Sequence, residues 1–432
     1  MKIKEIQHVV NLLPKIEFAD IHPDNIRYHL SNLRQITFEI TDICNLKCKY
    51  CGYGEFYSNF DKRENKNLPI EKGYAILDYL SKLWNSDMNV SLDRNVYISF
   101  YGGEPLLNMD FIKVMINYVK NELKCPNRHF SFSMTTNAML VDKHMDFIAE
   151  NNFYLLVSLD GNRENHSYRV DHSGKNSFDR VIKNIKLLQK KYPDYFEKYV
   201  NFNSVLHNRN SYEKIYRYIK KKFGKMPNIT GLNDMGIRDD MKESFLATYR
   251  NAYENLMQSE HYDEIEKEMF LKSGNYNNLT IFLHQYSPFV FRDYSELLYN
   301  KREKNIVPTG TCLPFSKKIF ITVNGKILPC ERIGHQFGMG QINDNNIVHL
   351  DFEQIASKHN AYLNKVSAQC KTCKIIKSCI QCIYNLENLD GKPVCKGYTN
   401  QQEFERYVNS QMMFLEKHPE DYYRIMEEVI VE

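Results

Sequence analysis

The 432-residue sequence lacks the features that mark membrane, disordered and nucleic-acid-binding proteins. Its longest uninterrupted apolar run is Phe153–Val157, whereas a membrane-spanning helix needs about 20 apolar residues. Lysine and arginine exceed aspartate and glutamate by only four charges, an excess too small to indicate a nucleic-acid partner. With 43% apolar and 25% charged residues, the chain has the composition of an ordinary folded protein of two or three domains.

The beginning of the sequence also lacks an export signal. Lys2 and Lys4 supply positive charge, but Glu5, Gln7 and His8 interrupt the apolar core that a signal peptide would need. We therefore expect a cytoplasmic protein whose thiols are kept reduced.

Cysteine is the residue type that is unexpectedly plentiful. Eleven cysteines, an odd number, do not indicate a disulfide framework in a reducing compartment. Three lie at positions 44, 48 and 51, seven lie between Cys312 and Cys395, and Cys125 stands alone. Clusters of this kind usually bind a metal ion or an iron–sulfur cluster. Cys125, which precedes Pro126 at the end of an expected helix, is expected to be structural.

Short apolar strands alternate with amphipathic helices between residues 35 and 235. Residues 36–40 alternate as a half-buried strand should, and a helix is expected at 70–84. Asn108 is expected to cap a helix whose buried stripe is Phe111, Val114, Met115 and Tyr118. Further strands are expected at 96–101, 130–134, 153–158, 199–206 and 228–232, with helices near 142–151, 177–188 and 211–222. These units predict an α/β fold with a parallel sheet, either doubly wound or a barrel, and a ligand site at the carboxyl ends of the strands.

The later part of the sequence has a different pattern. Residues 236–305 predict a helical bridge without strands, and the chain after Cys312 is expected to be small, turn-rich and cysteine-dense. Asn324-Gly325 lies between two β-type runs in residues 318–328, which is a strong signal for a hairpin. A final helix is expected to carry Phe404, Tyr407, Val408 and Leu415 on its apolar face.

The first three cysteines, Cys44, Cys48 and Cys51, follow directly after the first expected strand. On so short a loop, three thiolates can converge on one [4Fe–4S] cluster and leave one iron open; a zinc site or a chance triplet is the alternative. The next three strands end in polar or glycine-containing segments, at 101–105, 135–137 and 157–161. All of these segments are expected at one edge of the sheet, where paired glycines would let a ligand approach the backbone.

On these motifs, residues 35–235 resemble the radical S-adenosylmethionine (radical SAM) superfamily. The resemblance implies a partial (β/α)6 TIM-like barrel, a [4Fe–4S] cluster on the three cysteines, and bound S-adenosylmethionine (SAM). It implies a 5′-deoxyadenosyl radical that abstracts hydrogen from a substrate. The residues that it implies as SAM contacts are Tyr50 near the adenine, Gly102, Gly103 and Glu104 at the methionine amino group, Asn137, Ser158 and Arg169.

The second group of cysteines, with a Gly325-x4-Cys330 hairpin, resembles the SPASM extension of radical SAM enzymes that modify peptides. The resemblance implies a small α+β domain with two auxiliary [4Fe–4S] clusters, three clusters in all. It assigns one cluster to Cys370, Cys373, Cys379 and Cys395, and the other to Cys312, Cys330 and Cys382 with an unassigned fourth ligand. Two residues separate Cys379 from Cys382 where the family usually has three. From the residues alone, a zinc ribbon is the alternative.

The resemblance points to a peptide maturase that installs a C–C, C–S or C–O crosslink on a ribosomally made precursor peptide, because the run Cys51–Tyr57 is similar to such maturases. The alternative is an anaerobic sulfatase-maturating enzyme, which typically has an aspartate directly after the second cysteine of the extension. Here that position is Glu331, a candidate catalytic base or a surface acid. An epimerase and a non-catalytic iron–sulfur or zinc-binding scaffold are further alternatives.

The expected division is an N-terminal extension at 1–34, the barrel at 35–235, the helical bridge at 236–305, the SPASM domain at 306–400 and a C-terminal helix at 401–432. The extension is too short to form an independent leader-binding domain. We therefore expect that either a separate leader-binding protein or another surface of this chain, such as the helical bridge, binds the leader of the precursor peptide. A reductant such as flavodoxin or ferredoxin is the other expected partner. No nucleic acid and no membrane is expected as a partner.

Overall fold

The computed structural model describes residues 17–91, 94–126, 128–270, 274–286, 290, 298, 305–307 and 312–428. The chain divides into two compact units, each of which is described by itself. The first unit contains Met1–His22, Glu268–Cys312 and Ala356–Glu432, and the second contains Pro23–Lys267 and Leu313–Ile355. The first 16 residues of the expected extension, and much of the expected bridge after residue 286, lie outside the described residues.

The second unit is built on a ten-stranded sheet whose order is β12-β11-β10-β9-β2-β3-β4-β5-β6-β7. Six successive strands are parallel, which confirms the predicted α/β architecture. They are β2 (Gln35–Thr41), β3 (Asn95–Gly102), β4 (His129–Thr136), β5 (Tyr154–Ser158), β6 (Val200–Val205) and β7 (Asn228–Thr230).

The hairpin predicted around Asn324-Gly325 is confirmed, and it belongs to this same sheet. Strands β9 (Ile319–Ile321) and β10 (Lys326–Leu328) are antiparallel to each other, and β9 is parallel to β2. Strands β11 (Gly340–Ile342) and β12 (Val348–Leu350) continue the antiparallel part. Gly325 has φ +81°, the left-handed backbone that glycine adopts without strain.

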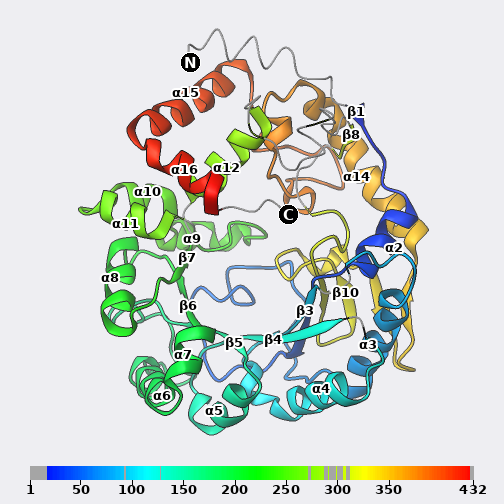
Figure 1. Cartoon of the computed structure of the whole chain (residues 1–432), viewed down its shortest axis with the longest axis vertical. Helices are drawn as coiled ribbons and strands as arrows, with labels where there is room; N and C mark the ends of the chain where they lie inside the picture. Colours follow the sequence, from blue (N-terminus) through cyan, green and yellow to red (C-terminus); the bar gives the residue numbers. More distant parts are fainter. Residues whose placement is uncertain are drawn as a thin grey trace. The chain divides into compact units, whose positions relative to one another are not determined.

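Helices cover the outer side of the parallel strands (Figure 1). Those between the strands are α3 (Ile70–Trp84), α4 (Met109–Asn121), α5 (Val141–Glu150), α6 (Phe178–Lys191), α7 (Pro193–Tyr199) and α8 (Tyr212–Phe223). The other helices of this unit are α2 (Pro23–Ser31), α9 (Lys242–Thr248), α10 (Ala252–Met257) and most of α11 (Tyr262–Met269). Short 3₁₀ turns in the chain lie at Pro105–Leu107, Asp239–Met241, His335–Phe337, Ile376–Ser378 and Ile383–Asn385.

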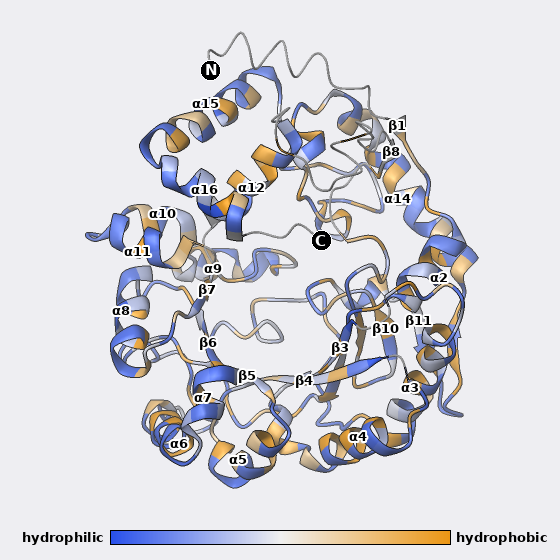
Figure 2. Cartoon of the chain, in the orientation of Figure 1, coloured by the Kyte–Doolittle hydropathy of each residue, from blue (hydrophilic) through white to orange (hydrophobic). Residues whose placement is uncertain are grey.

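Helix α4 shows which parts of its sequence-based prediction are right and which are wrong. Asn108 caps it as predicted, because its side-chain oxygen accepts a hydrogen bond from the backbone N–H of Phe111. Two predicted core positions are wrong: Val114 and Tyr118 are only half-buried, whereas Ile112, Ile116 and Val119 are buried. The apolar stripe is thus rotated by about one position toward Ile112, and the helix is apolar on one side only (Figure 2).

The first unit is mainly helical. It contains α12 (Gly274–Tyr286), most of α14 (Phe352–Thr372), α15 (Gln401–Lys417) and α16 (Pro419–Glu428). The final helix was predicted, and its Phe404 and Val408 pack in one apolar cluster with Phe270, Phe282 and Ile425. Two expectations are wrong here. The 21-residue α14 runs through a region expected to be turn-rich, and β8 (Asn305–Ile306), paired with β1 (Glu17–Phe18), ends a stretch expected to lack strands.

Candidate active site

The three N-terminal cysteines lie on the loop that leaves the carboxyl end of β2. The end of β3 packs against this loop: the N–H groups of Gly103 and Glu104 donate to the carbonyls of Thr41 and Ile43, at 2.8 and 2.9 Å. A Cβ on Gly102 or Gly103 would lie 2.1 Å from one of these same carbonyl oxygens. The paired glycines are therefore required by the approach of the chain's own backbone, whatever ligand they also admit.

The cysteine loop is held from its other side by the segment after β5. The N–H groups of Lys47 and Lys49 donate to the carbonyls of Val170 and Tyr168, at 2.7 and 3.1 Å. Leu46 and Asp171 form an antiparallel bridge. Between these bonds, buried Leu46 and half-buried Cys48 alternate with the exposed Lys47 and Lys49.

The thiols of Cys44, Cys48 and Cys51 are half-buried and interact electrostatically with one another. Burial raises the pKa of Cys44 to about 11 and that of Cys48 to about 12. In both cases the neighbouring thiols contribute to the rise. Three thiols gathered in this way can bind a metal cluster as thiolates.

Glu104 is enclosed at the same edge of the sheet, with 1% of its surface exposed. One carboxylate oxygen accepts hydrogen bonds from the hydroxyl of Thr136 and the N–H of Leu106, at 2.6 and 3.2 Å. The other accepts from the N–H of Asn137 at 2.7 Å, and burial raises the pKa of Glu104 to about 7. The carboxylate thus joins the ends of β3 and β4. The amide of Asn137 in turn donates to the side chain of Asn45, at 2.7 Å, on the cysteine loop.

Tyr50 and Arg169 meet at a buried acid that the sequence prediction did not include. Asp160 is fully buried, accepts a hydrogen bond from the Tyr50 hydroxyl, and forms a two-pronged ion pair with Arg169 at 2.9 and 3.1 Å. Burial alone would raise the pKa of Asp160, but the guanidinium keeps it below its usual range. The ring of His207 stacks on Tyr50 with centroids 5.4 Å apart. The sequence signal for Asp160 is its place two residues after the end of β5, beside Ser158.

The predicted SAM contacts therefore gather along one edge of the sheet. Gly102 and Ser158 end β3 and β5, and Asn137 directly follows β4. Arg169 is 7% exposed and already paired. Its visible role is to hold Asp160 and Tyr50.

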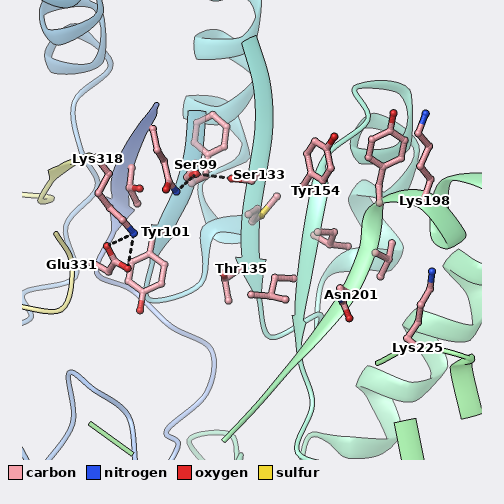
Figure 3. A pocket seen from close by; sticks show the side chains of 18 of the residues that line it. Ser99, Tyr101, Ser133, Thr135, Tyr154, Lys198, Asn201, Lys225, Lys318 and Glu331 are labelled. Atoms are coloured by element: carbon pink, nitrogen blue, oxygen red, sulfur yellow. Dashed lines mark hydrogen bonds and ion pairs between the residues drawn. The ribbon is translucent and has the colours of Figure 1, made fainter. Parts of the chain in front are cut away.

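A cavity of about 470 Å³ lies along the strands below this edge (Figure 3). Thr37, Ser99, Ser133 and Tyr154 occupy matching positions on β2 to β5 and line it together. The hydroxyls of Ser99 and Ser133 are 2.5 Å apart, and Gln35 donates to Ser99 at 2.7 Å. The wall therefore combines these polar groups with apolar side chains of the same strands, such as Phe100, Met134 and Leu155. The alternation of polar and apolar residues along each strand is the sequence signal for the polar part of this wall.

Glu331 lines the same cavity, although it comes from the segment after β10. Both of its carboxylate oxygens lie 3.0 Å from the ammonium of Lys318, and the two side chains face each other near Tyr101 (Figure 3). Burial alone would raise the pKa of Glu331, but Lys318 leaves it below its ordinary value. The group is consequently a carboxylate that can accept a proton. Burial raises the pKa of the adjacent thiol, Cys330, to about 12, with Glu331 adding to the rise.

Four cysteines gather in the first unit. The thiol of Cys370 is buried and interacts electrostatically with those of Cys373, Cys379 and Cys395, and burial together with these neighbours raises its pKa to about 12. Of the other predicted set, Cys312 and Cys382 belong to this unit and Cys330 to the second unit. Cys125 is buried as expected, but α4 ends at Asn121, four residues before it.

Residues 38–221 match the model of the family described as the radical SAM superfamily. The chain contains a radical SAM domain. This domain favours an enzyme over a non-catalytic scaffold.

Relatives of this chain include a sulfatase-maturating enzyme and a cyclopropyl synthase. A cysteine-type anaerobic sulfatase-maturating enzyme from Clostridium novyi is 26% identical over 344 residues, covering 78% of this chain and 83% of that protein. The radical SAM cyclopropyl synthase TigE from Paramaledivibacter caminithermalis is 26% identical over 218 residues, covering 49% of this chain and 43% of that protein. The solved structure of native anSMEcpe with bound AdoMet has a TM-score of 0.58 at 19% identity, covering 89% of this chain and 98% of that one, and shows the same fold.

Radical SAM domains bind SAM and a [4Fe–4S] cluster, and the residues present fit both. Within the described ranges, no group of three or more His, Cys, Asp or Glu side chains is placed to hold a single metal ion. Three thiols on one loop instead suit a cluster, in which each thiolate binds a different iron. No helix in the described part of the chain is long and apolar enough to cross a bilayer.

Proposed function

We propose that this chain is a radical SAM peptide maturase that oxidises a residue of a ribosomally made precursor peptide and joins it in a C–C, C–S or C–O crosslink. The observation that carries the proposal is the Lys318–Glu331 pair in the cavity. It brings a proton acceptor from the segment after β10 into the cavity that β2–β6 line.

Cys44, Cys48 and Cys51 would hold the cluster. Tyr50, Gly102, Gly103, Glu104, Asn137, Ser158 and Arg169 would surround SAM. When bound, this pair supplies a 5′-deoxyadenosyl radical that removes one hydrogen atom from the substrate. The chain's part is positional: Asp160 holds Tyr50, and Glu104 holds Asn137, so the contacts at the sheet edge are set before SAM arrives.

Glu331 is proposed as the base. The 5′-deoxyadenosyl radical would take a hydrogen atom from the substrate, and an auxiliary [4Fe–4S] cluster would accept the second electron. The proton that remains would pass to the carboxylate of Glu331, which Lys318 holds ionised. The cavity volume of about 470 Å³ is in the range of small-ligand pockets and suffices for a side chain rather than a folded segment. Glu331 and the cavity wall would therefore enclose only the side chain that is modified.

Two auxiliary clusters complete the proposal, giving three [4Fe–4S] clusters. The mutual proximity of Cys370, Cys373, Cys379 and Cys395 supports one of them. Cys312, Cys330 and Cys382 are proposed for the other by resemblance alone. A separate leader-binding protein, a flavodoxin- or ferredoxin-type reductant and a cytoplasmic location follow from the same resemblance and from the reduced thiols.

Formylglycine formation on a sulfatase is the second candidate. It is favoured by the similarity to the sulfatase-maturating enzyme, which extends over 78% of this chain, whereas the similarity to the cyclopropyl synthase extends over 49%. An acid one carbon longer than aspartate follows Cys330, and this difference favours another product.

The deciding experiment is anaerobic incubation of a candidate precursor peptide with the enzyme, SAM and a reductant in deuterated water, followed by mass spectrometry. Loss of two hydrogens, with no fragments between two residues, is expected for a crosslink. Gain of one non-exchangeable deuterium would instead mean an epimerase, and modification of only a Cys- or Ser-containing sulfatase peptide would mean the second candidate.

The role of Glu331 has its own matched pair of variants. Glu331→Gln keeps size and polarity but accepts a proton poorly, so product should fall at least about 100-fold while 5′-deoxyadenosine still forms. Glu331→Asp keeps the charge and should retain more product than Glu331→Gln. Equal product from the two variants would remove the base from the proposal.

A further inference from the structure

A row of three hydroxyl side chains crosses the wall of the cavity from β2 to β4. Thr37, Ser99 and Ser133 occupy matching positions on these neighbouring strands, and all three line the cavity. Because paired residues of adjacent strands present their side chains on the same face of a sheet, the three hydroxyls lie next to one another. We call these three residues the hydroxyl row.

The hydroxyl row has more hydrogen-bond donors than the surrounding protein accepts. Ser99 and Ser133 share a single hydrogen bond, so whichever hydroxyl donates, the hydrogen of the other has no acceptor among the described residues (Figure 3). Gln35 does not accept it, because its amide donates to Ser99. Thr37 is 4% exposed, and its buried hydroxyl has no hydrogen-bond partner within the described residues. The row therefore holds unpaired donors, which are costly when they stay unpaired in a buried place.

The charged side chains that line the cavity leave one positive charge in excess. Three lysines and two glutamates belong to the lining. Lys318 is paired with Glu331, and the ammonium of Lys225 lies 3.0 Å from the carboxylate of Glu197. Lys198, the third lysine, lies over an aromatic ring and forms no ion pair within the described ranges. An occupant with a negative charge would balance the charge of the lining.

We propose that this cavity binds a carboxylate of the peptide substrate, the side chain of an aspartate or glutamate residue, with the hydroxyl row as its hydrogen-bond donors. The inference rests on the proposed function and names the class of side chain that enters the cavity. A carboxylate only accepts hydrogen bonds, so it takes up the unpaired hydroxyl hydrogens, and its charge balances the lysine in excess. An aliphatic side chain would leave the hydroxyls unpaired, and a lysine or arginine side chain would add donors and positive charge.

The test is the binding of synthetic peptides to the full chain with its clusters reconstituted anaerobically, measured by titration with saturation-transfer NMR, which detects weak binding. The probes are acetyl-Gly-Gly-Xaa-Gly-Gly-amide peptides in which Xaa is glutamate, aspartate, glutamine or leucine. The better-bound acidic peptide should bind at least about tenfold more tightly than the glutamine and leucine peptides. Equal binding of the acidic and leucine peptides, or no binding of either, would overturn the proposal.

A fifth probe separates the two sources of a peptide carboxylate. Acetyl-pentaglycine with a free terminal carboxylate has the same charge as the glutamate peptide but no acidic side chain. It should bind at least about tenfold more weakly than the better-bound acidic peptide. Binding as tight as that of the acidic peptide would overturn the side-chain assignment and make the cavity a site for a chain terminus.

Variants of the hydroxyl row locate this binding in the cavity. Thr37→Val keeps the shape of the side chain but removes its hydroxyl, so affinity for the glutamate peptide should fall at least about fivefold, whereas Thr37→Ser should retain it. Thr248→Val is the matched control, because this buried threonine donates to the carbonyl of Ser244 outside the cavity. Circular dichroism verifies that the variants fold. An equal loss of affinity in Thr37→Val and Thr248→Val would contradict a role of the hydroxyl row.

The charge of the lining has a separate pair of variants. Lys198→Gln should reduce the preference for the glutamate peptide over the glutamine peptide, because the excess positive charge is lost. Lys190→Gln, at an exposed lysine outside the cavity lining, should leave the preference unchanged. An unchanged preference in Lys198→Gln would remove this lysine from the argument for an acidic occupant.

Failure of the proposed function has a different signature. In that case, binding of the probes would still depend on their carboxylate and on Thr37, but no precursor peptide would lose two hydrogens. Conversely, a precursor that is still crosslinked and bound equally well after amides replace all its acidic residues would contradict the carboxylate site and leave the proposed function standing.

Discussion

At the scale of single residues, the ends of the parallel strands are joined by buried acids. Glu104 accepts three hydrogen bonds and Asp160 binds both Tyr50 and Arg169. Each acid holds a segment that contacts the cysteine loop. The loop's three thiols are therefore positioned by side chains at or just after the ends of β3, β4 and β5 rather than by the loop alone.

Replacing Cys44, Cys48 or Cys51 by alanine should abolish SAM cleavage, because each thiolate is expected to bind a different iron of the cluster. The measurements are 5′-deoxyadenosine after anaerobic incubation and iron bound per chain. Cys125→Ala, at a buried cysteine outside every proposed set, should retain both. Cleavage that persists with two of the three cysteines replaced would contradict the assignment.

His359 should make the first unit sensitive to mild acid. Its ring is 1% exposed, and burial lowers its pKa to about 4, so the folded state refuses a proton that the unfolded state accepts below about pH 6.5. The free energy of unfolding should consequently fall by about 1.4 kcal/mol per pH unit between pH 6.5 and 4, and be unaffected by this residue above that range.

The check is the urea midpoint of the metal-free chain at pH 7.5 and 5.0. His359→Gln does not titrate and should lose less stability over this interval than the wild type. His349→Gln, at an exposed histidine of β12, should behave like the wild type. An unchanged loss in His359→Gln would show that other groups govern the acid response.

At the scale of elements, the β9–β10 hairpin joins the segment that carries Cys330 to the parallel sheet. Strand β9 pairs with β2, and the N–H of Val323 donates to buried Glu39 at 2.9 Å. Glu39 also binds Arg63 at 2.6 Å. The hairpin therefore fixes the position of the segment that carries Cys330 and Glu331.

Gly325→Ala should destabilise the second unit more than Gly224→Ala. Both glycines have positive φ, at +81° and +70°, so each variant should lose about 1–2 kcal/mol from backbone strain. A Cβ on Gly325 would also lie 2.7 Å from the carbonyl oxygen of Ile342, whereas one on Gly224 would meet nothing within 4 Å. Thermal unfolding of both variants measures the difference in stability. Equal losses of stability would show that the hairpin backbone shifts to relieve the contact without destabilising the fold.

At the scale of the whole molecule, the proposed clusters are distributed over two compact units. The three cysteines at the sheet edge lie in the second unit, and Cys370, Cys373, Cys379 and Cys395 lie in the first. This distribution predicts that losing the first unit's cluster leaves the radical chemistry of the second partly intact.

Cys370→Ala or Cys395→Ala should therefore lower the iron content by about one cluster and abolish peptide modification, while some SAM cleavage remains. Iron analysis, 5′-deoxyadenosine and peptide mass measure the three effects. Loss of both activities together with the far-ultraviolet dichroism signal would indicate unfolding instead, and would contradict the separation of roles.

The sequence alone determined the succession of elements in the sheet. Period-two strands, amphipathic helices and Asn-Gly between two β runs are local signals, so they predicted β2–β7, the helices between them except α7, and the hairpin. Cysteine spacing likewise marked both groups of thiols. Helix α14 was not predicted, because the cysteine at its end belongs to a group whose spacing indicated a turn-rich segment.

Only the tertiary structure decided which distant residues meet. Asp160 with Tyr50, Glu39 with Val323, and β9 beside β2 join positions up to 284 residues apart, and no local period encodes such a pairing. The structure also placed Lys318 and Glu331 in the cavity of β2–β6, which makes the acid an ionised group inside a pocket. The physical reason is that burial and charge pairing depend on which surfaces pack together, and packing is a property of the folded chain as a whole.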